Sequence, residues 1–294
     1  MSLKFRLVTI GDIVVLAAVL LFSAFTLYPF LYCLAYSLSD SKAILVNPVY
    51  IWPVKFTLEN YRIVFINQMI MPAFSVSVTR TVVGVLYTCV VTGLASYALT
   101  KTDMPGRRFF ALLLVIPMYL NGGIIANYVN IYQLGLFNNF MVYILPAGFV
   151  TFYMLIMRTY FNTIPSSLDE SARLDGASEI HIFIRIIFPL SMPIIATVAL
   201  FAGVWQWNSW FDAMVYTSSR SLRPLQMVLQ SILLANDTQA MMRQAAQQAR
   251  TKTAVSPETL QMATLIVAVF PIIIVYPFLQ KYFVKGMMIG AVKS

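Results

Sequence analysis

The segment from Ser166 to Pro189 holds the most regular arrangement of charged and small residues in this chain of 294 residues. Ser167 and Glu170 have the Ser-x-x-Glu spacing of a capping box, which predicts that a helix begins at Leu168. Gly176 stands where a glycine commonly ends a helix. The pattern therefore predicts a short helix followed by a sharp bend.

A second helix is expected directly after the bend. Ser178 is placed to cap it, its residues are rich in isoleucine, and Pro189 is expected to stop it. One side of the whole segment is apolar, and the other carries four charged side chains, Asp169, Glu170, Arg173 and Asp175. Such a polar face can dock against another protein, and it can equally belong to a surface hairpin that only joins two neighbouring elements.

A second group of side chains is suited to bind a polar molecule. Trp205, Asn208, Asp212 and Tyr216 follow one another at helical intervals, which predicts that they share one face of a helix. Aromatic rings stack on sugar rings, while Asn and Asp hydrogen-bond to hydroxyl groups. Trp and Tyr also collect at membrane interfaces, where they face lipid. Asn and Asp are costly to expose to lipid, so a polar path and a lipid-facing stripe both stay open.

The sequence offers no groups for catalysis, for a metal or for ATP. No Gly is followed by Lys anywhere, so a phosphate-binding P-loop is excluded. The single histidine, His181, excludes a His-based metal centre, and Cys33 and Cys89 lie far apart. Asp212 is the one carboxylate that we place inside an apolar stretch, whereas ion-coupled carriers commonly hold ionisable groups there. We expect no enzyme activity and no cofactor in this chain, with the energy for any uphill transport coming from a partner.

The composition indicates a membrane protein. Apolar residues make up 60% of the chain and charged residues only 11%, whereas a soluble domain carries about 25% charged residues. A net charge of +9 would indicate nucleic-acid binding in a soluble protein. In a membrane protein the basic residues instead anchor helix ends and set orientation, so membrane lipid is an expected partner and nucleic acid is not.

Charge-free stretches predict six spans in one transmembrane domain over residues 1–294. A bilayer core requires about 20 apolar residues of helix, and this criterion selects stretches of about residues 13–36, 81–100, 109–131, 140–160, 191–216 and 259–281. Asn121-Gly122-Gly123 interrupts the third, either as a plain turn or as a break that opens backbone groups to a pore. The first apolar run is too long for the core of a signal peptide, so we expect an uncleaved span.

Six spans place both chain termini on one side of the membrane. Lys101, Arg107 and Arg108 lie together in one short turn, where the bias of basic residues toward the cytoplasm is most reliable, so we expect both termini in the cytoplasm. Residues 162–190 then lie on the cytoplasmic side, between the fourth and fifth spans. On the outer side, residues 239–250 favour a helix that is either a solvated face or a contact surface for a partner.

The segment from Ser166 to Pro189 resembles the EAA loop of ABC importer permeases. The motif stands here as Glu170-Ser171-Ala172-Arg173-Leu174-Asp175-Gly176-Ala177 and is closed by Pro189, with Ser171 in place of the usual middle Ala. Nearly the whole chain is similar to permeases for carbohydrate uptake of the maltose type, in the branch for larger or acidic oligosaccharides. The residues that carry this similarity are Leu58-Glu59-Asn60-Tyr61, Pro105-Gly106-Arg107-Arg108, Leu134-Gly135-Leu136, Trp207-Asn208 and the tail from Tyr282 to Lys293.

The resemblance implies an all-α membrane protein with the type I ABC importer permease architecture and a cytoplasmic coupling helix. Glu170 would be the polar contact to an ATPase, Ala172 a close-packing position and Gly176 the bend, with Asp169, Arg173 and Asp175 on the same coupling surface. Trp205, Asn208, Asp212 and Tyr216 would line the substrate path, although in the family the tight sugar site can lie mostly in the partner permease.

The resemblance also implies an assembly in a bacterial plasma membrane. Its members would be a second permease subunit in a heterodimer, an ABC ATPase dimer that binds ATP and Mg, and an extracytoplasmic sugar-binding protein. The alternative from another class is a secondary carrier or channel that works without an ATPase, which has no use for a capped helix-Gly-helix segment in the cytoplasm. An intramembrane enzyme would need paired catalytic groups, which the expected spans do not contain.

Overall fold

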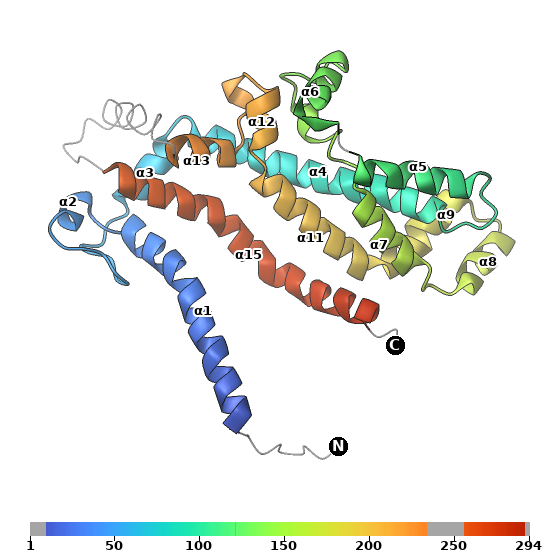
Figure 1. Cartoon of the computed structure of the whole chain (residues 1–294), viewed down its shortest axis with the longest axis horizontal. Helices are drawn as coiled ribbons and strands as arrows, with labels where there is room; N and C mark the ends of the chain where they lie inside the picture. The colour runs from blue at the N-terminus through green and yellow to red at the C-terminus, as the bar shows by residue number, and fades with distance from the viewer. Residues whose placement is uncertain (1–9, 121, 234–255, 292–294) are drawn as a thin grey trace. The chain divides into compact units, whose positions relative to one another are not determined.

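The computed structural model describes residues 10–120, 122–233 and 256–291, and its elements are helices (Figure 1). In these ranges β-type backbone pairing is limited to one isolated antiparallel bridge between Ser39 and Phe56. The expected helix at residues 239–250 lies outside the described residues. The chain forms two compact units, residues 1–68 with 231–269, and residues 69–230 with 270–294.

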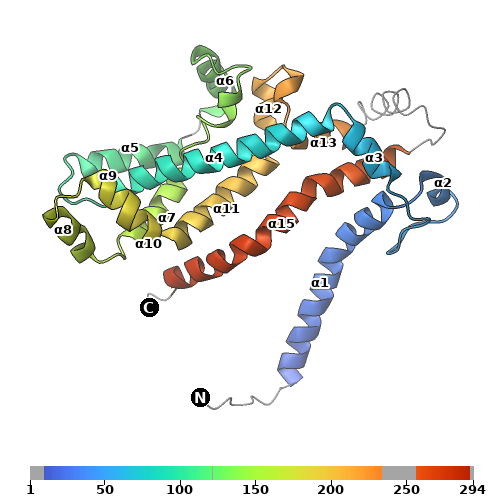
Figure 2. The same cartoon turned by 180° about the vertical axis from the view of Figure 1, so that it is seen from behind.

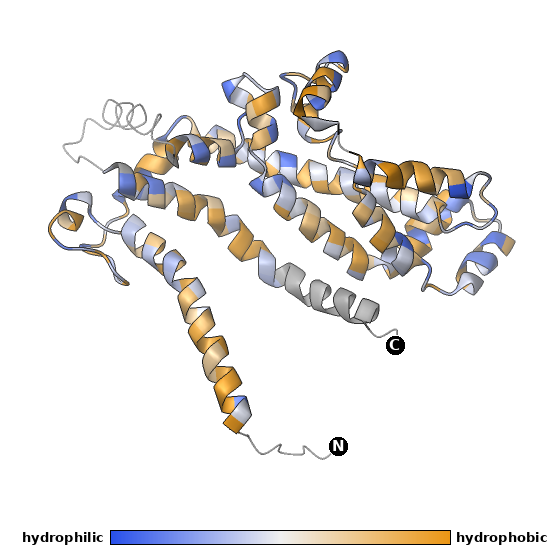
Figure 3. Cartoon of the chain, viewed as in Figure 1, coloured by the Kyte–Doolittle hydropathy of each residue, from blue (hydrophilic) through white to orange (hydrophobic). Residues whose placement is uncertain are grey.

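The first unit is organised around the end of one long apolar helix. Helix α1 (Ile10–Ser37) exposes nearly all of its side chains, and Figure 3 shows that most of them are apolar, as expected for a helix in contact with lipid. The short helices α2 (Ser41–Ile44) and α3 (Glu59–Ile66) follow. The buried Asn60 amide donates to the carbonyls of Ser37 at 2.7 Å and Ser39 at 3.0 Å, which ties α3 to the end of α1.

The same unit includes the beginning of helix α15 (Pro257–Ala291). The hydroxyls of Ser41 and the fully buried Thr259 lie 2.8 Å apart, so α2 is fixed to the first turn of α15. Gln261 donates to the carbonyl of Ile232 at 3.1 Å and holds the end of helix α13 (Leu225–Leu233) in the same place.

The second unit is built on helix α4 (Ile70–Ala98). Helix α11 (Met192–Asn208) runs along α4 in both Figure 1 and Figure 2, and helix α7 (Thr151–Phe161) packs beside them. A Cβ atom at Gly84 of α4 would lie 2.5 Å from the side-chain nitrogen of Gln206, so any larger residue here would displace the Gln206 side chain.

Helix α4 begins about three turns earlier than the span expected over 81–100 and therefore includes Arg80. The expectation that spans are free of charge placed the boundary wrongly, because Arg80 is fully buried and paired inside the protein. In the residues that the structure describes, three helices are long and apolar enough to cross a membrane: Ile10–Ser37, Ile70–Ala98 and Glu258–Pro277. The pair Glu179–Leu190 and Met192–Asn208, bent by 83°, is a fourth candidate.

The third and fourth expected spans are made of shorter pieces. Over 109–131, helix α5 (Arg107–Tyr119) ends before helix α6 (Gly123–Gln133) begins, and Gly123 has a positive φ of 76° that breaks the continuity; Asn121 itself lies outside the described residues. Over 140–160, a 3₁₀ turn η1 (Phe140–Tyr143) precedes α7. Pro146, which lies between these two elements, cannot donate a backbone hydrogen bond, which disfavours a continuous helix there.

Candidate functional site

The segment after α7 forms a helix, a bend and a second helical stretch. Helix α8 (Ser166–Leu174) starts two residues before Leu168, and no side chain caps it. The capping-box prediction for Ser167 is therefore wrong. The extended backbone of Pro165 sets the start instead, because proline is tolerated where helix N–H groups have no partner.

The end of α8 confirms the bend predicted at Gly176. Its φ of 78° is left-handed, its N–H donates to the carbonyl of Arg173 at 3.0 Å, and the next N–H, of Ala177, donates to the carbonyl of Ala172 at 3.0 Å. These two bonds form a Schellman motif, which ends a helix and fixes the direction of the chain that follows.

Ser178 then caps the next helix, as predicted. Its hydroxyl accepts a hydrogen bond from the N–H of His181 at 3.4 Å, and helix α9 (Glu179–Ile182) continues into a π-helical turn η2 (Phe183–Ile187) and helix α10 (Phe188–Leu190). The predicted stop at Pro189 is wrong, because the wider turn, in which the N–H of Phe188 donates to the carbonyl of Phe183, admits a proline one residue later. The bend occurs at the buried Ser191.

A cluster of charged side chains holds α8 and α9 against the end of α4. The ammonium of Lys101 contacts the Asp169 carboxylate at 2.6 Å and the Glu179 carboxylate at 2.9 Å. Arg173 contacts the same two carboxylates at 3.2 and 2.6 Å, and the Tyr97 hydroxyl donates to Glu179 at 2.7 Å. We call these five residues the Lys101 cluster.

The electrostatics of this cluster favour its charged form. Burial on its own raises the pKa of the Glu179 carboxyl, but hydrogen bonds from Lys101 and Tyr97, together with the charges of Lys101 and Arg173, hold that pKa below its usual range. Among the predicted coupling residues, Asp169 and Arg173 are thus engaged within the chain. Sequence reasoning missed Lys101, Tyr97 and Glu179, because these contacts join segments far apart in the sequence.

The remaining coupling candidates lie at the surface of α8. Glu170 and Asp175 are exposed, and Glu170 makes no hydrogen bond or ion pair with any described residue. Leu174, on the last turn, is 90% exposed, which is unusual for a large apolar side chain in a polar segment. Ala172 faces the opposite way and packs against the apolar cluster around Phe161 and Phe183. The outer surface of α8 is thus left without a partner, and its inner surface is fixed.

The predicted substrate-path residues do not share one helix face. Helix α11 ends at Asn208, and helix α12 (Phe211–Tyr216) begins after a break at Ser209 and Trp210. Asp212 turns to Arg80 of α4 at 2.6 Å, and the ring of Tyr216 lies 6.3 Å from that of Tyr128. The prediction of one shared face is wrong because the helix is interrupted between Asn208 and Asp212.

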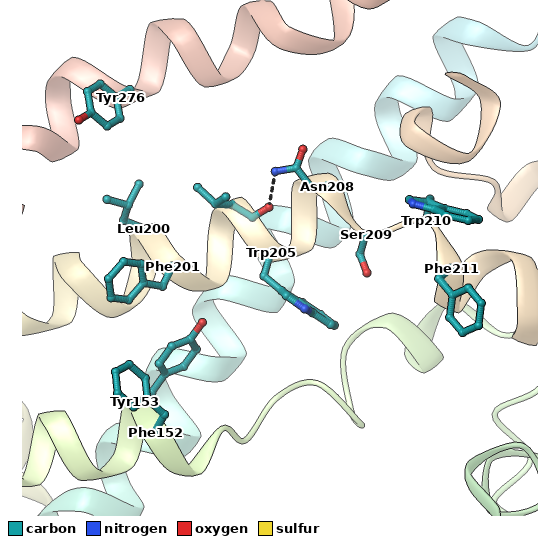
Figure 4. A pocket seen from close by; sticks show the side chains of 11 residues that line it. Phe152, Tyr153, Leu200, Phe201, Trp205, Asn208, Ser209, Trp210, Phe211 and Tyr276 are labelled. Atoms are coloured by element: carbon teal, nitrogen blue, oxygen red, sulfur yellow. Dashed lines mark hydrogen bonds between the residues drawn. The ribbon is translucent and has the colours of Figure 1, made fainter. Parts of the chain in front are cut away.

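Trp205 and Asn208 line a pocket of about 920 Å³ in the second unit (Figure 4). Its walls are mainly aromatic, and Trp205 is half exposed. Tyr153 and Phe211 also line the pocket, and Figure 4 shows the Trp205 ring and the Asn208 amide on different sides of α11. The other lining residues are Phe152, Leu200, Phe201, Val204, Ser209, Trp210 and Tyr276. Such a surface can stack on the apolar faces of sugar rings. The Asn208 amide nitrogen donates to the carbonyl of Val204 at 2.9 Å, and its oxygen can accept from sugar hydroxyl groups.

Comparisons with known proteins agree with these features. Residues 84–289 match the family described as the binding-protein-dependent transport system inner membrane component. Protein LplC of Bacillus subtilis is 38% identical over 92% of this chain and 90% of its own length. The polygalacturonan/rhamnogalacturonan transport system permease protein YtcP of the same organism is 32% identical over 96% of this chain and 98% of its own.

A solved structure gives the same result. It is the crystal structure of a bacterial ABC transporter involved in the import of the acidic polysaccharide alginate, and one of its chains is 30% identical to this one. The superposition covers 96% of this chain and 100% of that chain, with a TM-score of 0.87. This chain belongs to the family of inner membrane components of binding-protein-dependent transport systems.

Proposed function

We propose that the chain is the permease subunit of an ABC importer that takes up an oligosaccharide delivered by an extracytoplasmic binding protein. Its family supports the transport role. The substrate class rests on its relatives, which include YtcP, an arabinooligosaccharide permease, an alpha-glucoside permease and the alginate importer. In this proposal the chain crosses a bacterial plasma membrane six times, with both termini in the cytoplasm.

The observation that carries the proposal is that α8 is fixed on one side and exposed on the other. Its inner side is fixed by ion pairs, while Glu170, Leu174 and Asp175 are exposed. In our proposal this surface docks on an ATPase subunit, with Glu170 as the polar contact. ATP and Mg bind to the ATPase dimer, and its closure moves α8. A second permease subunit completes the membrane path.

Affinity purification of the chain from its native membrane in mild detergent tests the assembly. We expect a second multi-span protein and a P-loop ATPase to be recovered with it. Recovery of the chain alone, with transport of radiolabelled galacturonate or alginate oligosaccharides intact after reconstitution, would instead establish a carrier or channel.

The Glu170→Lys substitution is expected to weaken ATPase recruitment by about tenfold, because it reverses a charge at an interface without disturbing the fold. Glu170 is exposed and unpaired in the described part of the chain, so membrane insertion stays normal. The measurement is the amount of ATPase that co-purifies with the variant. The matched control is Glu258→Lys, the same change at an exposed position of α15. Equal recruitment by the two variants would contradict the docking role.

We further propose that the aromatic pocket lines the sugar path. Trp205→Ala is expected to lower uptake of the transported oligosaccharide by about tenfold, because a stacking aromatic ring contributes on the order of 1 kcal/mol beyond its buried area. Trp205→Phe, which keeps a ring, is expected to retain most of the activity. Uptake is measured in proteoliposomes together with ATP hydrolysis. If the Ala and Phe variants transport equally, stacking at this position has no role.

A further inference from the structure

Arg80 is the largest side chain that is fully buried in the described residues, and its guanidinium is used almost completely. It donates to both carboxylate oxygens of Asp212, at 2.6 and 3.3 Å, and to the side chain of Gln206 at 3.1 Å. It also donates to the backbone carbonyl of Ser209 at 3.2 Å, and it lies 4.3 Å from the centre of the Tyr143 ring. One side chain of α4 thus contacts both sides of the break between α11 and α12.

These contacts stabilise a backbone arrangement that is otherwise unfavourable. The break takes the carbonyl of Ser209 out of a regular helix, and Arg80 supplies its hydrogen bond. The side-chain amide of Gln206 donates a hydrogen bond to the carbonyl of Tyr143 at 3.0 Å. Asp212 accepts a hydrogen bond from the N–H of Ala213 at 2.9 Å. The last turn of α11, the break and the first turn of α12 are therefore all bonded to one network.

The residues that line the aromatic pocket are direct neighbours of those that Arg80 holds. Trp205 precedes Gln206, Ser209 itself lines the pocket, and Phe211 precedes Asp212. Figure 4 shows Trp205 on one side of the break and Trp210 and Phe211 on the other. The direction of the chain at the break therefore decides how far apart these walls stand.

We propose that Arg80 is a positioning residue that sets the shape of the aromatic pocket by fixing the break between α11 and α12. Its importance for transport rests on the proposed function of this pocket as the sugar path. Arginine suits the task because its planar fork donates several hydrogen bonds in fixed directions, whereas the single ammonium of lysine cannot hold Asp212, Gln206 and Ser209 together.

The test measures pocket geometry without any sugar. In a chain whose native cysteines are replaced by alanine, a single cysteine is placed at Asn208 in the pocket or at the exposed Lys42 of α2, which belongs to neither the pocket nor the docking surface. Its reaction rate with a charged, membrane-impermeant maleimide is then compared between the parent chain, Arg80→Lys and Asp212→Asn, each in the assembled complex. The second variant keeps the shape of the side chain, removes its charge and replaces one of the two oxygens that accept from Arg80 by an amide nitrogen.

We expect both variants to change the rate at position 208 by about tenfold, because each loses charged hydrogen bonds at the break. The rate at position 42 should stay constant, because α2 belongs to the first unit and Arg80 and Asp212 belong to the second. An unchanged rate at position 208 in both variants would overturn the proposal. Equal changes at the two positions would also overturn it, since Arg80 would then support the whole fold.

Uptake by the same variants separates the inference from the proposed function. If Arg80→Lys shifts the rate at position 208 and raises the oligosaccharide concentration for half-maximal uptake, with ATPase recruitment unchanged, Arg80 positions the sugar path. If the rate shifts and uptake stays unchanged, Arg80 still shapes the pocket, and the assignment of the pocket to the sugar is wrong. Failure to recover an ATPase would remove the importer role alone.

Discussion

Gly176→Pro is expected to abolish uptake while the chain remains in the membrane. Gly176 has a φ of 78°, which proline cannot adopt, and its N–H donates to Arg173, which proline would remove. The local cost is about 3 kcal/mol or more, enough to dismantle the Schellman motif. Helix α8 would then lose its fixed direction relative to α9, so its outer surface could no longer meet an ATPase in register. The measurement is oligosaccharide uptake by the assembled transporter, with membrane insertion verified separately.

The matched control is Gly176→Asn. Asparagine tolerates the left-handed backbone better than other residues that carry a side chain, and a Cβ atom at this position meets no atom within 4 Å. We therefore expect the Asn variant to keep most of the uptake. If proline and asparagine have the same effect, the backbone geometry of the bend is not what matters for transport.

The sequence predicted those features of the site that depend on near neighbours in the chain. The bend at Gly176 and the cap at Ser178 involve contacts over a few residues, and both are confirmed. The cap predicted at Ser167 competed with Pro165, whose fixed φ started the helix earlier. The break after Asn208 carries no glycine or proline, so no local signal marked it.

Contacts between segments far apart in the sequence could not be predicted from local patterns. Asp212 was expected in a polar stripe, yet its partner is Arg80, a residue that the charge-free criterion had placed outside the second span. Lys101 was used only to orient the chain, although it is the centre of the cluster that holds α8. A charge at the edge of an apolar stretch is a signal that a partner has to be found elsewhere in the sequence.

Helix α4 connects the two places where these distant contacts occur. Arg80, in its N-terminal half, holds the pocket side of α11, and Tyr97, near its end, contacts the cluster that fixes α8. From Arg80 to Ala98, at its end, α4 is a continuous helix about 27 Å long. A displacement of α8 can therefore reach the pocket through one stiff element, provided that α8 stays attached to it.

The ion pairs of Lys101 with Asp169 and Glu179 help to attach α8 to the end of α4. Lys101→Met is expected to reduce uptake by about tenfold or more, because it leaves Asp169 and Glu179 facing each other with only Arg173 to balance them, and a charged hydrogen bond contributes about 1.5–3 kcal/mol. The side chains of Lys101 and Asp169 are only 15% and 24% exposed, so solvent screens this pair weakly. ATPase recruitment should persist, since Glu170 and the outer surface of α8 are unchanged. The variant would then hydrolyse ATP without a matching uptake of sugar.

Two further variants decide whether the ion pair itself is responsible. Lys42→Met removes a lysine from the exposed surface of α2 and is expected to leave uptake unchanged. Lys101→Glu is expected to be more damaging than Lys101→Met, because it places a third carboxylate among those of Asp169 and Glu179. Adding Asp169→Lys to Lys101→Glu restores one pair of opposite charges and should recover part of the uptake. Normal coupling in Lys101→Met, measured as sugar molecules imported per ATP hydrolysed, would mean that the ion pairs of Lys101 are not needed to hold α8.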